Sequence, residues 1–261
     1  MAFTDSHAHL DDARFESDRT AVLARARQAG VERILTIGNG SRAADFQKTL
    51  ELLENYEMLW GGLGVHPHEA GRAEEAVLAE LDALVRRPRV LAWGEIGLDY
   101  HYDHSPREAQ RAIFRRQLQG ARLQKLPVII HCRDAWDDCL QILAEEWASS
   151  GLAGILHCFS GSREAAQRAV EWGFLISFAG NVTFPRAEKL RAVARALRPE
   201  HLLIETDSPY LAPQAARGQR NEPAQVVEVA TVLGSLHGLT AEEMGARTSE
   251  NFLRLFPCAR A

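Results

Sequence analysis

Short apolar runs, many of them rich in β-branched residues, recur along the chain. Each is bounded by turn-forming residues, and their near-continuous apolar character is typical of strands in a sheet that is buried on both faces. There are eight of them, at residues 3–9, 31–38, 58–66, 90–98, 127–132, 154–159, 174–180 and 202–207. We therefore expect eight buried strands.

The segments between these runs have the period of amphipathic helices. One example is an apolar face formed by Val77, Leu78, Leu81, Leu84 and Val85. Capping boxes at residues 105–108 and 240–243 predict two helix starts, the first with Pro106 at its first helical position. Gly173 predicts a helix end. The pattern is one of strands alternating with helices.

This alternation, without a linker rich in Pro, Gly or Ser, predicts an α/β fold with a single (βα)8 TIM barrel over residues 1–261. The alternative is an open doubly wound sheet. No GxGxxG motif follows the first run, and polar residues end several runs, including the first and the last. In a closed barrel those ends converge on one mouth, whereas an open sheet separates them. The barrel is the better prediction.

Composition narrows the class of protein. The chain is 46% apolar and 25% charged, as in globular proteins. It has neither a secretion signal nor an apolar stretch of about 18 residues, so we expect a cytoplasmic protein without a membrane span. The net charge of −5 argues against a protein that coats nucleic acid by charge alone. It does not exclude an enzyme whose phosphate-binding charge comes from metal ions.

Histidine and carboxylate side chains follow the apolar part of five runs. In the first, His7 and His9 share a face because side chains alternate along a strand. Such a pair alone is more often structural than metal-binding. Six such groups at one mouth indicate a common binding partner, because burying each of them unpaired would cost free energy. They are His7, His9, Glu95, His131, His157 and Asp207. Four imidazoles and two carboxylates match the ligands of one or two divalent metals, with Glu95 or Asp207 able to bridge.

Seven motifs, in order along nearly the whole chain, resemble those of the TatD-type metal-dependent deoxyribonucleases, a branch of the amidohydrolase-like barrels. They are DSHAHL from Asp5, GVHPH from Gly64, GEIGLDY from Gly94, HCRDA from His131, HCFSG from His157, ETDSP from Glu205 and RNEP from Arg220. The resemblance implies one metal ion held by His7, His9, Glu95 and Asp207, and a second held by Glu95, His131 and His157. It also implies 3′ to 5′ exonuclease hydrolysis of DNA in the cytoplasm.

Roles beyond metal binding are assigned to a few residues. Asp207 is the candidate general base, with a purely ligating role as the alternative. Arg133 lies two residues beyond His131 and could clamp a phosphate. His66 could contact substrate or orient a ligand. Arg220 and Asn221 are substrate contacts by resemblance, although Arg220 could equally form a loop ion pair.

Other polar residues receive structural interpretations. Cys132 and Cys158 each follow a candidate ligand, so strand alternation predicts that both point away from the mouth as small buried hydrophobes. His101 and His104 lie in a polar loop and are expected to be exposed. The five tryptophans are spread over separate elements and are interpreted as packing residues rather than a surface for stacking bases.

Two other activities remain open. The same cage of ligands could attack a small amide, lactone or ester, or remove a mischarged amino acid from tRNA. Many amidohydrolase-like relatives bridge their metals through a carboxylated lysine where this chain has Glu95, which favours the nuclease. The metal could be Mg, Mn or Zn. We expect a DNA substrate, as single strands or frayed ends, and no obligatory protein partner.

Overall fold

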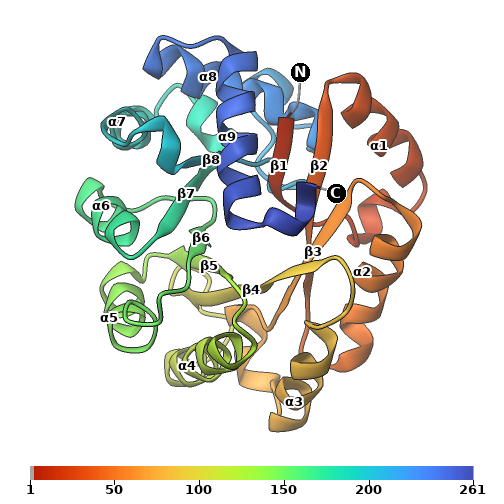
Figure 1. Ribbon diagram of the computed structural model, residues 1–261, viewed down its shortest axis with the longest axis vertical. Coiled ribbons are helices and arrows are strands. Elements are labelled where there is room, and N and C mark those ends of the chain that lie inside the picture. The colour runs from red at the N-terminus through yellow and green to blue at the C-terminus, as the bar shows by residue number, and fades with distance from the viewer. Residues whose placement is uncertain (1–2, 261) are drawn as a thin grey trace.

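The computed structural model describes residues 3–260 and shows the predicted barrel (Figure 1). The sheet has eight parallel strands in chain order. They are β1 (Phe3–Ala8), β2 (Val31–Asn39), β3 (Leu59–Gly64), β4 (Val90–Asp99), β5 (Val128–Arg133), β6 (Gly154–Leu156), β7 (Phe174–Phe178) and β8 (Leu202–Ile204). A parallel bridge between Ala8 and Ser208 joins the first strand to the segment after the last. The prediction of eight strands and a barrel is confirmed.

In the described part of the chain, helices surround the sheet, seven of them in the crossovers between its strands and two, α8 and α9, after the last strand (Figure 1). They are α1 (Arg19–Gln28), α2 (Ala43–Asn55), α3 (Glu75–Leu84), α4 (Arg107–Gln124), α5 (Trp136–Glu146), α6 (Arg163–Glu171), α7 (Glu188–Ala196), α8 (Val226–His237) and α9 (Ala241–Leu255). No helix within residues 3–260 has the length and apolar character needed to cross a membrane.

The predicted helix ends are confirmed in two cases and wrong in one. Thr240 and Glu243 form the capping box that opens α9, and Gly173, with φ +88°, follows the end of α6. At the start of α4 the cap is Pro106, which is not the first helical residue. Ser105 is not a cap because its hydroxyl donates to the His68 carbonyl and accepts from the Gly71 N–H.

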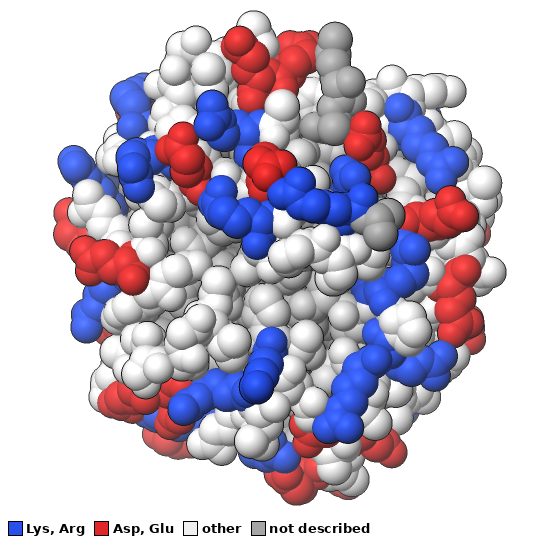
Figure 2. Space-filling view, viewed as in Figure 1, with Lys and Arg blue, Asp and Glu red and all other residues white. Residues whose placement is uncertain are grey.

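The barrel has two apolar clusters, a large one that includes the buried faces of the helices and a smaller one inside the barrel. The smaller cluster closes one end of the barrel. Leu91, Ile129, Leu175 and other residues near the starts of their strands form this smaller cluster together with Phe252 of α9. Figure 1 shows α9 lying across this end of the barrel. On the same face, basic and acidic side chains are interspersed (Figure 2). Ligands therefore have access from the opposite end, where the strands finish.

Candidate metal centre

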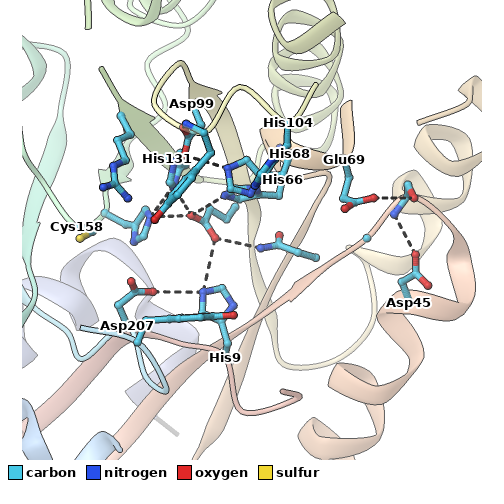
Figure 3. Close-up of a pocket in the computed structure, with 18 of the residues that line it drawn as sticks. His9, Asp45, His66, His68, Glu69, Asp99, His104, His131, Cys158 and Asp207 are labelled. Carbon is cyan, nitrogen blue, oxygen red and sulfur yellow. Dashed lines mark hydrogen bonds and ion pairs between the residues drawn. The ribbon is translucent and has the colours of Figure 1, made fainter. Parts of the chain in front are cut away.

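The six predicted ligands meet at the carboxyl ends of the strands. Five of them line a pocket of about 1790 Å³ at this end, and the sixth, His7, is fully buried beside it. Figure 3 shows His9 and Asp207 on one side of this pocket and His131 and Asp99 on the other. The convergence follows from the fold, because parallel strands of a barrel end on one rim.

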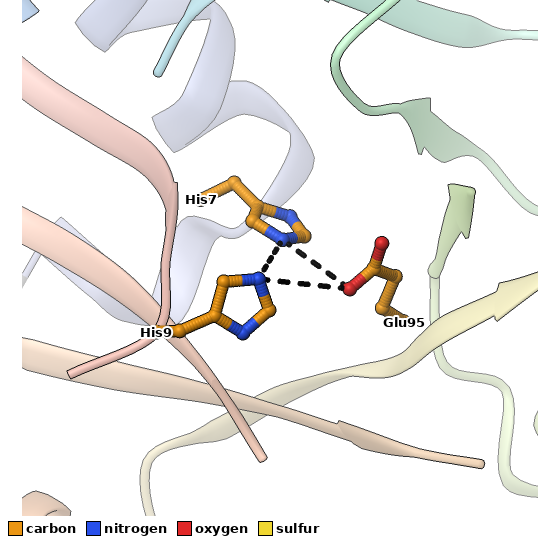
Figure 4. A group of neighbouring side chains, drawn as sticks. All are labelled: His7, His9 and Glu95. Carbon is orange, nitrogen blue, oxygen red and sulfur yellow. Dashed lines mark hydrogen bonds and ion pairs between the residues drawn. The ribbon is translucent and has the colours of Figure 1, made fainter. Parts of the chain in front are cut away.

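Glu95 lies between two groups of histidines and is only 2% exposed. Its Oε2 lies 3.5 Å from Nε2 of His7 and 3.8 Å from Nε2 of His9 (Figure 4). Its Oε1 lies 2.8 Å from Nδ1 of His131 and 2.7 Å from Nε2 of His157. Each carboxylate oxygen therefore faces a different pair of imidazole nitrogens.

An irregularity in β4 places this carboxylate. The register between β4 and β5 shifts between Gly94 and Ile96, so Glu95 is the extra residue of a β-bulge. Gly97 follows, with φ +142°, and a Cβ there would lie 2.0 Å from the His131 carbonyl oxygen. Only glycine permits this close approach of the two strands.

Asp207 completes the group on the β1 side. Its Oδ1 lies 3.3 Å from Nε2 of His9 and 3.8 Å from Nε2 of His7. The backbone of Asp207 is left-handed, with φ +55°, and its N–H donates to the His7 carbonyl. Its side chain is 13% exposed and faces the pocket, so it can reach a bound molecule.

Two further carboxylates lie behind His131 of β5 and His157, which directly follows β6. Asp99 Oδ2 accepts from Nε2 of His131 at 3.0 Å, and Glu205 Oε1 lies 3.3 Å from Nδ1 of His157. Both carboxylates are buried. A carboxylate on the far nitrogen fixes the tautomer and orientation of a ligating histidine. Sequence reasoning assigned neither residue a role, although both lie in the quoted motifs.

Two histidines after β3 extend the same network. Nε2 of His66 lies 3.5 Å from Oε1 of Glu95, close enough to make it a further candidate ligand beside His131. Burial lowers the pKa of His66 to about 4, so its imidazole is neutral at pH 7. Nε2 of His68 lies 3.0 Å from Oδ2 of Asp99. No role was predicted for His68 from the sequence.

The carboxylates and histidines at the centre have pKa shifts that favour the binding of a cation. Burial favours the neutral form of Glu95, yet the surrounding histidines hold its pKa well below the usual value. Burial alone would lower the pKa of His9, but its hydrogen bond to Asp207 and the charge of Glu95 raise it to about 9. The carboxylates thus draw protons onto neighbouring imidazoles, which a divalent ion would displace. Neutral imidazole and carboxylate in this grouping are suitable ligands for such ions.

The predicted substrate contacts divide into two sets. Arg133 lines the pocket, and its guanidinium lies 4.8 Å from the ring centre of Tyr102. Arg220 and Asn221 do not line it and are engaged in contacts within the protein. Arg220 is held by Asp18 through bonds of 2.8 and 2.7 Å. Asn221 is fully buried, and its amide donates to the carbonyls of Thr206 and Tyr210, which fixes the loop after β8.

The cysteine predictions hold only in part, because both cysteines line the pocket. Cys132 is buried within β5, as expected, although it borders the pocket. Cys158 also lines the pocket (Figure 3). For Cys158 the reason is that β6 ends at Leu156, so strand alternation does not extend to this residue, whose φ is +42°.

The polar loop after β4 is exposed, as predicted, yet part of it forms the pocket wall. His101 and His104 are both exposed. His104 and Tyr102 nevertheless line the pocket, and their rings stack with centroids 5.5 Å apart. No sequence pattern distinguished these two residues from the solvent-facing members of the loop.

Comparison with known proteins places the chain in a family. Residues 4–257 match the model of the family described as TatD related DNase. The uncharacterized metal-dependent hydrolase YabD of Bacillus subtilis is 41% identical over 252 residues, which cover 97% of this chain and 98% of that protein. The 3′-5′ ssDNA/RNA exonuclease TatD of Klebsiella pneumoniae is 35% identical over 257 residues and 97% of each chain.

A solved structure agrees in both fold and length. The crystal structure of YjjV, a TatD homologue from Escherichia coli, superposes with a TM-score of 0.90 and 36% identity over 98% of each chain. Fold, motifs and relatives therefore agree along nearly the entire sequence. The chain belongs to the TatD related DNase family and is a metal-dependent hydrolase.

Proposed function

We propose that the protein is a 3′ to 5′ exonuclease that hydrolyses phosphodiester bonds in DNA with two divalent metal ions. The observation that carries this proposal is the division of Glu95, whose two oxygens face separate pairs of histidines. A bridging carboxylate of this kind suits a pair of ions rather than one. The exonuclease name of the Klebsiella relative supports the choice of reaction.

The chain offers one set of ligands to each ion. The first ion would be held by His7, His9, Asp207 and Oε2 of Glu95. The second would be held by His131, His157 and Oε1 of Glu95. When bound there, such ions would supply Lewis-acid polarisation of a phosphoryl oxygen and a lower pKa for the attacking water. The candidate metals remain Mg, Mn and Zn.

The protein's own side chains supply the remaining steps. Asp207 faces the pocket and, as general base, accepts a proton from the attacking water. Arg133 lines the same pocket and neutralises charge on the phosphate. Asp99 and Glu205 hold the rings of His131 and His157 in place through their far nitrogens.

The size of the pocket favours a polymer over a small substrate. Sites for small molecules enclose about 300 to 1,000 Å³, whereas this pocket measures about 1790 Å³. The ligands lie at its floor, so a single strand or frayed end reaches them more easily than a duplex does. No lysine occurs among the described residues that line it, unlike the site of a lysine-bridged amidohydrolase.

The test is digestion of end-labelled oligonucleotides by metal-stripped protein resupplied with Mg, Mn or Zn. A ladder shortening from the 3′ end of a single strand is expected, and its absence in Glu95→Gln would tie the activity to this site. An RNA strand run in parallel reports the choice of sugar. Efficient turnover of a small ester or amide, or of aminoacyl-tRNA, with DNA untouched under every metal, would refute the proposal.

A further inference from the structure

Large hydrophobic side chains that are exposed gather at the pocket. Among the described residues there are three, Tyr102 at 51%, Leu123 at 79% and Tyr210 at 48% exposure. Leu123 lies on α4 and does not line the pocket, whereas both tyrosines do. Half-exposed aromatic rings beside a catalytic centre point to a ligand that covers them.

The two tyrosines lie on opposite sides of the mouth. Tyr210 follows β8 and Tyr102 follows β4, and these strands are four apart in a barrel of eight. The ring of Tyr210 lies 5.8 Å from that of His9, and the ring of Tyr102 stacks on that of His104. Figure 3 shows His9 and His104 on opposite sides of the centre. The candidate metal ligands therefore lie between the two rings.

Each ring is held in place by an arginine and by the backbone. The guanidinium of Arg14 lies 4.3 Å from the ring centre of Tyr210, and that of Arg133 lies 4.8 Å from that of Tyr102. The Tyr210 N–H donates to the Asp207 carbonyl, and the Tyr102 N–H donates to a carboxylate oxygen of Asp99. The position of each ring is thus tied to the centre itself.

We propose that Tyr210 and Tyr102 stack the nucleobases on either side of the phosphate that is cleaved. The inference rests on the proposed function and specifies its substrate as a base-bearing, unpaired strand. Stacking on an aromatic ring tolerates any base, because every base has a π-face. Arg133 beside Tyr102 can also pair with a neighbouring phosphate, whereas Arg14 beside Tyr210 already pairs with Asp12. Bases paired in a duplex cannot separate onto opposite walls, so the rings select single strands.

The test compares two oligonucleotides of equal length on the metal-loaded protein. One carries normal bases, and in the other the last two nucleosides at the 3′ end are replaced by tetrahydrofuran residues without bases. Tyr210→Ala and Tyr102→Ala should each raise KM for the normal strand by roughly 5- to 150-fold, the range of one base stack, with kcat changing less. Neither should raise KM for the base-free strand further, because that strand lacks the stacking partner.

Matched variants separate stacking from folding. Tyr210→Phe and Tyr102→Phe keep the ring and should retain the KM of the natural protein. Leu123→Ala removes an exposed hydrophobic side chain outside the pocket and should change nothing. Equal increases in KM on both strands, or no increase on the normal one, would overturn the inference while leaving the nuclease proposal intact.

A failure of the proposed function is recognised separately. If the natural protein hydrolyses neither strand, the dissociation constants of the same two oligonucleotides, from fluorescence anisotropy, become the readout. Preference for the normal strand that is lost in the alanine variants would still support the stacking rings. Equal affinity for both strands would overturn them.

Discussion

The two halves of the candidate metal centre differ in what supports their histidines. On the β5 and β6 side, His131 and His157 each have a buried carboxylate at the nitrogen that faces away from Glu95. Nδ1 of His7 and Nδ1 of His157 are both buried without a hydrogen bond, but of the two histidines only His157 lies within 4.0 Å of the Glu205 carboxylate. The β1 and β8 side instead contributes Asp207, which faces the pocket directly. The additional carboxylates of the β5 and β6 half therefore lie beside the far nitrogens of its histidines, whereas that of the β1 and β8 half faces the pocket.

This difference suggests a division of labour within one site. Carboxylates behind the ligands increase the basicity of the imidazoles and fix their orientation, which favours tight metal binding. A carboxylate that reaches the pocket is available for proton transfer. We therefore expect the β5 and β6 half to hold its ion more tightly and the β1 and β8 half to contribute more to the chemical step.

The largest effect is expected from Glu95→Gln, which acts on both halves at once. Because each oxygen of Glu95 faces one pair of histidines, the change removes shared charge from both positions. Metal content and activity should fall together, with kcat lower by roughly 10³-fold. Elemental analysis and kinetics on the same preparation check this, and the natural protein should hold two ions. A variant that keeps both ions would show that Glu95 does not bridge.

Asp207→Asn tests the catalytic role of the β1 and β8 half. The amide keeps an oxygen ligand of similar shape but cannot accept a proton. Metal content should therefore fall less than in Glu95→Gln, while kcat drops by about 10²-fold or more. Near-normal turnover by the metal-loaded Asp207→Asn variant would show that Asp207 is only a metal ligand and not the general base.

The sequence predicts the part of this centre that follows from where the strands end. The six candidate ligands follow from polar residues at the ends of buried runs, because a barrel brings all such ends to one mouth. The bulge at Glu95 has no local signature, and it is this shift in register that turns the carboxylate between the histidines. The supporting roles of Asp99 and Glu205 depend on which ring nitrogen each one meets, and that is a tertiary property.

The contacts of Cys158, Arg220 and the two pocket tyrosines also depend on the tertiary structure. Cys158 was assigned by alternation beyond the point where its strand ends. Arg220 was assigned by resemblance, but its partner Asp18 is 202 residues away in sequence and comes close only in the folded barrel. Tyr102 and Tyr210 were missed because nothing local distinguishes an exposed ring at a pocket from any other loop tyrosine.

Glu205→Gln and Asp99→Asn test the supported half. Each change keeps the shape of the side chain but removes the charge that a ligating histidine faces. The affinity for one ion should fall by about 10- to 100-fold. Calorimetric titration resolves the two ions, so the ion of the β1 and β8 half serves as the internal control. Equal loss at both positions would contradict the proposed division.

Metal affinity should fall as the pH is lowered, because some of the ligating histidines bind protons in competition with metal. In the metal-free protein, the carboxylate partners described above raise the pKa of His9 to about 9 and also raise that of His131, despite burial. His9 is therefore protonated at pH 7, and His131 holds its proton to higher pH than a free imidazole, so metal must displace protons to bind. Apparent affinity should rise up to tenfold per pH unit for each displaced proton and level off above pH 9. Titration in buffers of different ionisation enthalpy counts the protons, and the absence of proton release would refute this assignment.

The smallest effect is expected from Arg220→Ala, at the edge of the β1 and β8 half. Arg220 pairs with Asp18 just before α1, and the nearby Glu222 pairs with Arg25 of α1. These contacts fasten the loop after β8 to the outer helix layer. The side chains of Arg220 and Asp18 are 29% and 34% exposed, so solvent screens the pair and its loss should cost little stability. The midpoint of thermal unfolding should therefore fall only slightly. KM for a single strand should stay unchanged, in contrast to Arg133→Ala within the pocket. A rise in KM without a change in Tm would restore Arg220 as a substrate contact.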